Sequence, residues 1–363
     1  MQRLIFIQPA IASYRQAFYK GLAKNFKVEV YACKKDFLNV KSITLDEHVI
    51  QHYSPGFISF FRKKIFWHMN LPLIKCAKKN DVVILNGNPR IINYMLLLII
   101  CRLRRIKVIW WGHGWSSGSY GVLAKFRLRI MCLANLILLY TDRECEMVKH
   151  VKTYALNNGL DSNSIKNEIK KHSANIVRDP NLIKLIFVGR LTPKANILFL
   201  IKALKYTPGN IHLDIVGDGE MKEQIDRAIA DNGLRPRVRL LGALFDESSL
   251  AKIMMSSDAF VYPGAVGLSL IHAFNYGLPA IIHDDERYHM PEFSAFKNKV
   301  NGFSYKRGSQ ESLIKTLTEF ASLPQTERDA ISLKAMKTIQ YTYNTDDMVK
   351  RMTNIIEHLT SKG

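Results

Sequence analysis

Short apolar runs alternate with segments of helical spacing along most of this 363-residue chain. A run of four to eight apolar residues predicts a strand buried on both faces, and apolar residues three or four apart predict an amphipathic helix. We assign strands to residues 4–7, 28–32, 81–85, 107–111, 136–140, 182–188, 212–216, 237–241, 259–262 and 280–282. Helical patterns between these runs predict an α/β fold with doubly wound parallel sheets.

Residues 261–285, VYPGAVGLSLIHAFNYGLPAIIHDD, show one complete unit of this pattern. Pro263 and Gly264 end the strand, because proline donates no ladder hydrogen bond. Residues 267–276 have helical spacing, and Gly277 fits the left-handed position after a helix. Glycines before a helix leave backbone N–H groups available at the positive end of its dipole. We expect this helix start to bind a phosphate; an ordinary crossover helix is the alternative.

The chain is long for a single core, and its middle is polar. With 363 residues and 47% hydrophobic content, two domains are expected. We predict an N-terminal domain over 1–178 and a C-terminal domain over 179–343, both Rossmann-like. The last helix, about 344–363, is expected to pack back on the first domain. Residues 34–60 fit neither periodicity.

The apolar segments indicate neither a membrane span nor a secretory signal. No run reaches the roughly 18 residues that a span needs. The longest, 91–101, contains Asn93 and is followed by arginines, which predicts a buried helix. The five cysteines have no metal-ligand spacing, so we expect reduced, buried thiols in a cytosolic protein, with no metal.

The net charge of +21 is concentrated in the first half of the chain. Residues 1–178 hold 29 Lys/Arg and 10 Asp/Glu, a net +19, whereas residues 179–363 hold 23 and 21, a net +2. This asymmetry favours an anionic partner, either nucleic acid or a membrane leaflet; a merely soluble basic domain is the alternative. Two basic segments predicted as helices, 61–79 and 123–133, favour a membrane interface. A buried helix with a solvated face also fits 61–79.

Several candidate ligand-binding residues follow the C-terminal ends of predicted strands, where open parallel sheets bind ligands. In the second half these residues are Gly189, Arg190, Lys194, Gly217, Gly264 and Gly267. An arginine, a lysine and a helix N-terminus at one sheet edge are expected to bind a diphosphate. In the first half, His113 follows the strand 107–111 between two glycines. A loop histidine bonded to its own backbone is the alternative for this residue.

The sequence lacks the motifs of several other chemistries. No G-x-G-x-x-G follows the first strand, which argues against a dinucleotide cofactor. No Walker lysine loop, Ser/His/Asp order or metal-ligand cluster is present. The candidate residues that remain are those after the predicted strands of the second half, which are expected to bind a diphosphate.

At these strand ends the chain resembles the family-4 retaining glycosyltransferases of the GT-B fold. The segments FVGRLTPK, LDIVGDGE, VRLLGALFDESSLAKIMMSSDAFVYPG and VGLSLIHAFNYGLPAII follow the family order. The resemblance covers nearly the whole chain and is most specific over 185–282. QPAIASYRQAFY resembles the acceptor-side start of such enzymes, and WWGHGWSSG resembles their loop near the transferred sugar. The resemblance implies two domains that face each other across a cleft. It also implies transfer of a sugar from a UDP- or GDP-linked donor with retention of configuration, with no metal or other cofactor.

The resemblance also implies roles for the candidate residues. Arg190 and Lys194 would hold the diphosphate, helped by backbone amides at Gly267 and Leu268. The strand end at 241–242 would hold the base.

In the first half, the same resemblance puts His113 near the transferred sugar and Tyr14 and Arg15 near the acceptor. Many relatives use lipid-linked saccharide acceptors in building surface polysaccharides such as O-antigen or capsule. We therefore expect a cytoplasmic protein, peripheral on the inner face of the cell membrane, with no nucleic-acid partner.

Three positions depart from the family pattern, which has two glutamates separated by seven residues. Gly264 stands at the first glutamate position and His272 at the second. The second glutamate normally binds the ribose hydroxyls, and a neutral imidazole can make one or two such bonds. The first normally touches the donor sugar, a contact that glycine cannot replace. Lys194 also stands one residue early, with Ala195 at the family position.

These departures leave alternatives open. His272 also fits a core-facing position on its helix, and the missing glutamates also fit a catalytically dead relative. A nucleotide-sugar epimerase of the same fold would need carboxylates in the cleft, of which few are visible. A nucleic-acid-binding protein would explain the basic first half, but no recognised binding motif accompanies the charge.

Overall fold

The computed structural model describes residues 1–37, 40–62, 64–72, 75, 77–113, 129–148, 152–176 and 179–361. The chain forms two compact units. Unit 1 comprises Met1–Asp161 and Thr345–Gly363, and unit 2 comprises Ser162–Asn344. Among the described residues, no helix combines the length and the apolar content needed to cross a membrane.

Unit 1 contains a parallel sheet of seven strands in the order β3-β2-β1-β6-β7-β8-β9. The strands are β1 (Arg3–Ile7), β2 (Lys27–Cys33), β3 (Ile50–Ser54), β6 (Val82–Asn86), β7 (Lys107–Trp111), β8 (Leu136–Leu139) and β9 (Thr153–Ala155). The central strands β1 and β6 are almost fully buried, which explains their uninterrupted apolar sequences.

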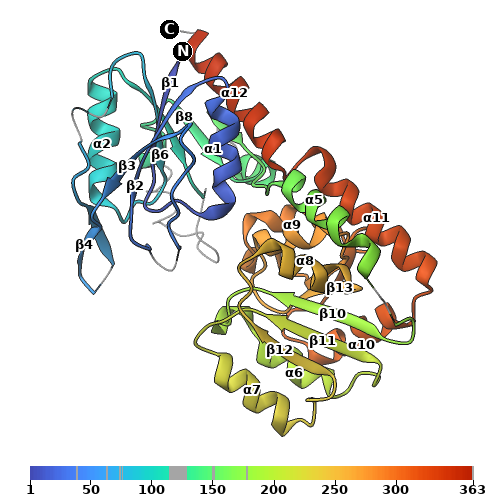
Figure 1. The fold of residues 1–363 in the computed structure, drawn as a ribbon. Helices are drawn as coiled ribbons and strands as arrows, with labels where there is room; N and C mark the ends of the chain where they lie inside the picture. The colour runs from blue at the N-terminus through green and yellow to red at the C-terminus, as the bar shows by residue number, and fades with distance from the viewer. Residues whose placement is uncertain are drawn as a thin grey trace. The chain divides into compact units, whose positions relative to one another are not determined.

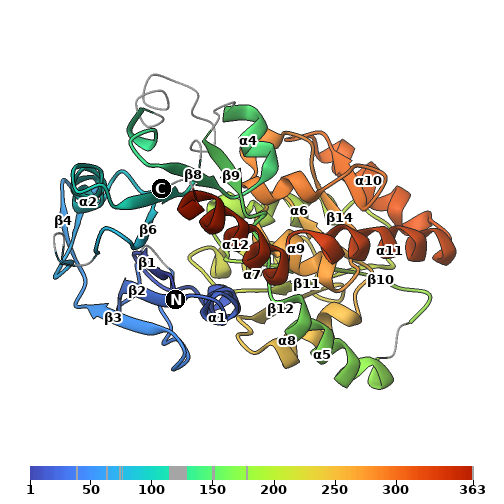
Figure 2. The same ribbon diagram turned by 90° about the horizontal axis from the view of Figure 1, so that it is seen from above.

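Helices cover both faces of this sheet. On one face, α1 (Gln16–Ala23) and α12 (Thr345–Ser361) pack together (Figures 1 and 2) and bury Phe18, Leu22 and Met352. On the other face, α2 (Ile92–Leu103) buries Tyr94 and Leu98. The last helix of the chain therefore belongs to unit 1. Helix α4 (Asp142–Val148) lies between β8 and β9 in the sequence.

The helix expected over 61–79 is wrong. Instead, β4 (Phe57–Phe60) and β5 (Ile65–His68) form an antiparallel hairpin. In β5, Phe66 and His68 are buried while their neighbours are half-buried, which is the period of two of a strand. The His68 ring bonds to the hydroxyls of Ser54 and Tyr94. The second expected basic helix, 123–133, lies largely outside the described residues.

Unit 2 contains a parallel sheet of six strands in the order β12-β11-β10-β13-β14-β15. The strands are β10 (Ile183–Val188), β11 (Ile211–Val216), β12 (Val238–Gly242), β13 (Ala259–Tyr262), β14 (Ala280–His283) and β15 (Gly302–Tyr305). The order runs outward in one direction from β10 and in the other from β13. The point where the order reverses therefore lies between β10 and β13.

The two faces of this sheet carry different helices, as Figure 1 shows. Helices α6 (Ile197–Leu204), α7 (Lys222–Asp231) and α10 (Gln310–Ser322) share a core with the odd-numbered residues of β10 and β11. Helices α5 (Ser162–His172), α8 (Glu247–Met255), α9 (Leu268–Asn275) and α11 (Gln325–Tyr341) form the opposite layer. The predicted α/β class, with two Rossmann-like doubly wound domains of GT-B type, is confirmed.

The boundary between the units lies earlier than the sequence indicated. Residues 162–172, which the predicted boundary at 178/179 assigned to the N-terminal domain, form α5 and pack against α8 and α9 of unit 2. His172 bonds through Nε2 to Ser248 Oγ at 2.8 Å. The polar composition of residues 162–172 reflects a helix with one narrow buried face, which includes Ile165.

Candidate functional site

The reversal of strand order in unit 2 defines a candidate ligand site. In open parallel sheets, ligands bind beyond the C-terminal ends of the strands where the order reverses. Here those strands are β10, which is followed by Arg190, and β13, which is followed by Gly264. The sequence candidates of unit 2 therefore follow these two strands and their neighbours.

Backbone hydrogen bonds tie the loops after β10, β11 and β12 together. The N–H of Gly189 donates to the carbonyl of Val216 at 3.0 Å, and the N–H of Gly217 donates to the carbonyl of Gly242 at 2.8 Å. Gly217 has φ +151°, and a Cβ there would lie 1.9 Å from the carbonyl oxygen of Gly189. The close contact requires glycine at 217. Leu241, the expected base contact, is half-buried at the end of β12.

Arg190 and Lys194 are two exposed cations at this edge. Neither forms an ion pair with a carboxylate in the described parts of the chain. Burial raises the pKa of the Tyr262 phenol, and the positive charge of Arg190 opposes that rise. Arg190 therefore lies close to the end of β13. An exposed arginine without a carboxylate partner can make bidentate bonds to a diphosphate.

The backbone at Lys194 touches the loop that leads into α9. The N–H of Ala265 donates to the Lys194 carbonyl oxygen at 3.3 Å. A Cβ on Gly264 would lie 1.9 Å from that oxygen and 2.8 Å from the carbonyl carbon of Ala195. The place of the first family glutamate is thus occupied by backbone. The glycine at 264 and the turn that carries Lys194 form one structural unit.

The start of α9 is held in place by a buried histidine. His289 Nδ1 accepts the N–H of Val266 at 3.1 Å, and its Nε2 donates to the carbonyl of His283 at 2.9 Å. Gly267 caps the helix, and its N–H and that of Leu268 have no acceptor among the described residues. The available N–H groups at the helix start are suited to an anion. Sequence reasoning did not identify His289.

His289 and His283 make stability depend on pH. Burial lowers the pKa of His289 to about 3 and that of His283 to about 4. Unfolded histidine binds a proton below about pH 6.5. The contribution of the two neutral histidines to stability is therefore fully present above about pH 6.5. It is lost as the pH falls toward their pKa values in the folded protein. Between pH 7 and pH 5, we expect His289 alone to lower the free energy of unfolding by about 2 kcal/mol.

Urea unfolding of the whole chain at both pH values measures this loss. The matched variant is His289→Asn, which removes the titrating group. Its loss of stability between pH 7 and pH 5 should be smaller than that of the wild type. Equal pH dependence in the two proteins would exclude His289 as the source.

His272, on α9, is hydrogen-bonded to a carboxylate of the neighbouring helix α8. Its Nε2 lies 2.7 Å from Oε1 of Glu247, the first residue of α8, and the Tyr276 hydroxyl donates to the same oxygen at 2.6 Å. Burial opposes ionisation of Glu247, but the bonds from His272 and Tyr276 outweigh it, so its pKa lies below the usual range. Sequence reasoning did not identify Glu247, because His272 and Tyr276 are 25 and 29 residues away from it along the chain.

The candidates of the first half lie in unit 1. His113 follows β7, with its Nδ1 3.9 Å from Oε1 of the buried Glu144 and its ring 4.4 Å from that of Tyr140. Tyr14 is 40% exposed, whereas Arg15 is buried. The Arg15 guanidinium lies over the Trp111 ring and donates to Asn158 Oδ1, so it is engaged within unit 1.

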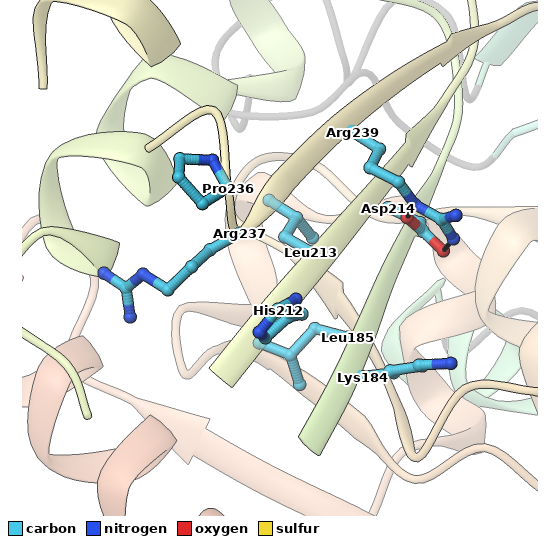
Figure 3. Close-up of a pocket in the computed structure, with 8 residues that line it drawn as sticks. All are labelled: Lys184, Leu185, His212, Leu213, Asp214, Pro236, Arg237 and Arg239. Atoms are coloured by element: carbon cyan, nitrogen blue, oxygen red, sulfur yellow. Dashed lines mark hydrogen bonds and ion pairs between the residues drawn. The ribbon is translucent and has the colours of Figure 1, made fainter. Parts of the chain in front are cut away.

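A cavity at the other end of the unit 2 sheet differs in character. Figure 3 shows Lys184, His212, Arg237 and the Arg239–Asp214 pair among its lining residues, at the starts of the strands. Arg239 forms two bonds to Asp214. Arg237 donates to the carbonyl of Leu204, at the end of α6, and to that of Pro208. These arginines already have partners, so the cavity is the weaker candidate for an anionic ligand.

The comparisons with known proteins agree with the site in unit 2. Residues 168–338 match the family described as "Glycosyl transferases group 1". The amylovoran biosynthesis glycosyltransferase AmsK of Erwinia amylovora is 25% identical over 191 residues, which are 49% of this chain and 45% of AmsK. This match, like the match to the uncharacterized glycosyltransferase MJ1607 of Methanocaldococcus jannaschii, spans less than half the length of the relative. Unit 2 therefore carries the sequence pattern of the group 1 family, and the epimerase and nucleic-acid alternatives are not favoured.

Solved structures resemble the whole chain. A sucrose-phosphate synthase from Thermosynechococcus elongatus has a TM-score of 0.74 at 14% identity, with all of both chains covered. HepE of Anabaena, in complex with UDP, has a TM-score of 0.69 at 16% identity and covers 99% of this chain and 100% of its own. At such identities the likeness establishes the fold.

Proposed function

We propose that this protein is a retaining glycosyltransferase that moves a sugar from a UDP- or GDP-linked donor to a saccharide acceptor. The observation that carries the proposal is the pair of exposed cations, Arg190 and Lys194, beside the start of α9 at the point of strand reversal. The family match over the same residues supports it. HepE, which resembles this chain in fold, is in complex with UDP. UDP is the nucleoside diphosphate that a UDP-linked donor would leave after transfer of its sugar.

Departure of the nucleoside diphosphate leaves negative charge on the phosphate oxygen that was bonded to the anomeric carbon. In our proposal, Arg190, Lys194 and the dipole of α9 stabilise that charge from fixed positions. The acceptor hydroxyl attacks the anomeric carbon from the face that the phosphate leaves, and its proton passes to the departing phosphate oxygen. The cations make a metal ion unnecessary for charge neutralisation.

Unit 1 is proposed to supply the acceptor side. Of the two residues expected there, Tyr14 is the better contact because it is exposed, whereas Arg15 is held by Asn158 and Trp111. His113 is proposed to contact the transferred sugar. The role of AmsK in amylovoran biosynthesis supports a saccharide acceptor in polysaccharide synthesis.

Turnover of a panel of UDP- and GDP-sugars tests the proposal. We expect one donor to release its nucleoside diphosphate faster when lipid-linked saccharides from cell membranes are added. A change of sugar configuration without release of the diphosphate would indicate an epimerase. Binding of a nucleotide sugar without turnover under any condition would indicate a catalytically dead relative.

We also propose a peripheral location on the cytoplasmic leaflet, with a lipid-linked acceptor. Between residues 48 and 141 the sequence has fourteen Lys/Arg and a single carboxylate, Asp81. The exposed face of α2 carries an apolar stripe, Ile92, Leu96, Ile99 and Leu103, spaced as one helix face. Arg102 and Arg104, both exposed, flank Leu103 at the end of the stripe. An apolar stripe bordered by cations is suited to an anionic lipid surface.

The β4–β5 turn extends this surface. Phe60 and Phe61 are exposed there. Arg90, just before α2, donates from Nε to the carbonyl of Lys64 at 2.8 Å, so the turn lies beside the helix start. Both views show the hairpin and α2 on the same outer side of unit 1 (Figures 1 and 2).

Substitution of Ile99 by aspartate is expected to weaken binding to anionic liposomes about tenfold, because one buried aliphatic side chain contributes roughly 1.5–3 kcal/mol. Co-sedimentation at low and high salt measures the effect. The matched control is Leu333→Asp on α11 of unit 2, since Leu333 is 48% and Ile99 is 47% exposed. Equal losses in both variants, or equal binding to neutral and anionic liposomes, would contradict the proposed surface. Stronger binding to DNA than to liposomes would revive the nucleic-acid alternative.

A further inference from the structure

The cluster of Glu247, His272 and Tyr276 has more acceptor capacity than the protein uses. Both donors reach the same carboxylate oxygen, Oε1, at 2.7 and 2.6 Å. An ionised carboxylate accepts at two oxygens, with about four lone-pair directions. Across the described ranges of the chain, no donor bonds to Oε2 of Glu247. The side chain of Glu247 is 35% exposed, so this second oxygen can reach a ligand.

The donors fix the orientation of the carboxylate. A carboxylate with a lowered pKa is ionised at neutral pH and only accepts, so Nε2 of His272 carries the proton of that bond. His272 is 12% exposed and makes an edge-on ring contact with Tyr276 at 5.4 Å. Two partly buried groups on α9 thus hold a more exposed carboxylate on α8. This arrangement is suited to present Oε2, and not His272, to a bound molecule.

Glu247 stands at the ligand-binding edge of the sheet. It is the first residue of α8, five residues after Gly242 ends β12, with Asp246 as the helix cap. The loops after β12, β11 and β10 are joined by the hydrogen bonds from Gly217 and Gly189. Glu247 therefore belongs to the same C-terminal edge as Arg190, and it faces α9, the helix that follows β13.

We infer that Glu247 binds the ribose hydroxyls of the nucleotide, with His272 and Tyr276 as positioning residues. This inference rests on the proposed function, since it needs a nucleoside diphosphate at this edge. A carboxylate at a strand end that accepts from ribose hydroxyls is a recurring solution in doubly wound sheets. Here a helix that follows a different strand supplies the carboxylate, and the histidine orients it.

The test compares a ribonucleotide with its 2′-deoxy form. Calorimetry on the full chain uses UDP or GDP, whichever the wild type binds more tightly, and dUDP or dGDP. We expect the wild type to prefer the ribonucleotide about tenfold, the effect of losing one charge-assisted hydrogen bond. In Glu247→Gln the preference should fall to about threefold or less. The matched control is Glu311→Gln, an exposed glutamate in the first turn of α10, which should keep the wild-type ratio.

The ratio of the two affinities distinguishes a contact of Glu247 with the ribose from a purely structural role in joining α8 to α9. Both ligands are measured on one preparation, so a general loss of stability affects the two affinities alike. A lower melting temperature with an unchanged ratio in Glu247→Gln would overturn the inference and leave the proposed function intact. If Glu247→Gln does not fold, Tyr276→Phe takes its place, with a smaller fall in the ratio expected and an unchanged ratio overturning the inference. Failure of the wild type to bind any nucleoside diphosphate would overturn both.

Discussion

Replacement of Arg190 by alanine is expected to lower sugar transfer by about two orders of magnitude. The guanidinium stands at the end of β10, exposed and without a carboxylate partner among the described residues. Removing one fixed positive group from a developing oxyanion costs roughly 3 kcal/mol, which corresponds to a factor of about 100 or more. The loss should appear in kcat, because the charge on the phosphate is greatest in the transition state.

Steady-state kinetics of the purified variant measure this loss, with circular dichroism as the check on folding. Arg227→Ala is the matched control: Arg227 is an exposed arginine on α7, where it bonds only within its own helix in the described structure. It should retain wild-type transfer. Wild-type turnover in Arg190→Ala would remove Arg190 from the mechanism.

Gly264→Ala is expected to destabilise the protein by about 3 kcal/mol and to abolish tight nucleotide binding. The new Cβ would lie 1.9 Å from the Lys194 carbonyl oxygen, and because that oxygen belongs to the backbone, no side-chain rotation relieves the contact. Forcing atoms into a packed site typically costs 1–3 kcal/mol. The backbone shift would also displace Lys194 from the start of α9, which lowers the affinity for the diphosphate.

Urea unfolding and nucleotide titration of the variant test this expectation together. Gly209→Ala is the control, because a Cβ at Gly209 meets no atom within 4 Å. Equal stability of the two variants would show that the loop at 264 relaxes freely. The same geometry predicts that Gly264→Glu, which restores the family residue, fails to improve transfer.

Strand positions could be read from the sequence, because the central strands of both sheets are buried on both faces and therefore appear as unbroken apolar runs. The run 182–188 corresponds to β10, which begins one residue later, and the run 259–262 has the same bounds as β13. Glycine and proline fixed the ends of the focal helix to within one residue at each end. The predicted strand ends also indicated where Arg190 and Lys194 lie, since the C-terminal ends of parallel strands meet at one edge of the sheet.

Other features depended on contacts between distant residues. The sequence predicts a helix over 61–79, but β5 of the β4–β5 hairpin lies there. Its alternation of buried and half-buried residues spans only four residues beside a basic segment, which is too short to recognise in the sequence. Arg15 looked available for a ligand, but Trp111 and Asn158 hold it. The close approach of Lys194 to Gly264 and the pairing of Glu247 with His272 join residues on different loops and helices, which local patterns do not encode.

Calorimetric titration of UDP and GDP into the wild type and Arg190→Ala tests the central claim most directly, namely that the edge of unit 2 at the strand reversal holds a nucleoside diphosphate. The account predicts that one of the two nucleotides binds to the wild type at a single site and binds at least tenfold more weakly to Arg190→Ala, while Arg227→Ala matches the wild type. Absence of binding for both nucleotides, or equal affinity in wild type and Arg190→Ala, would contradict it.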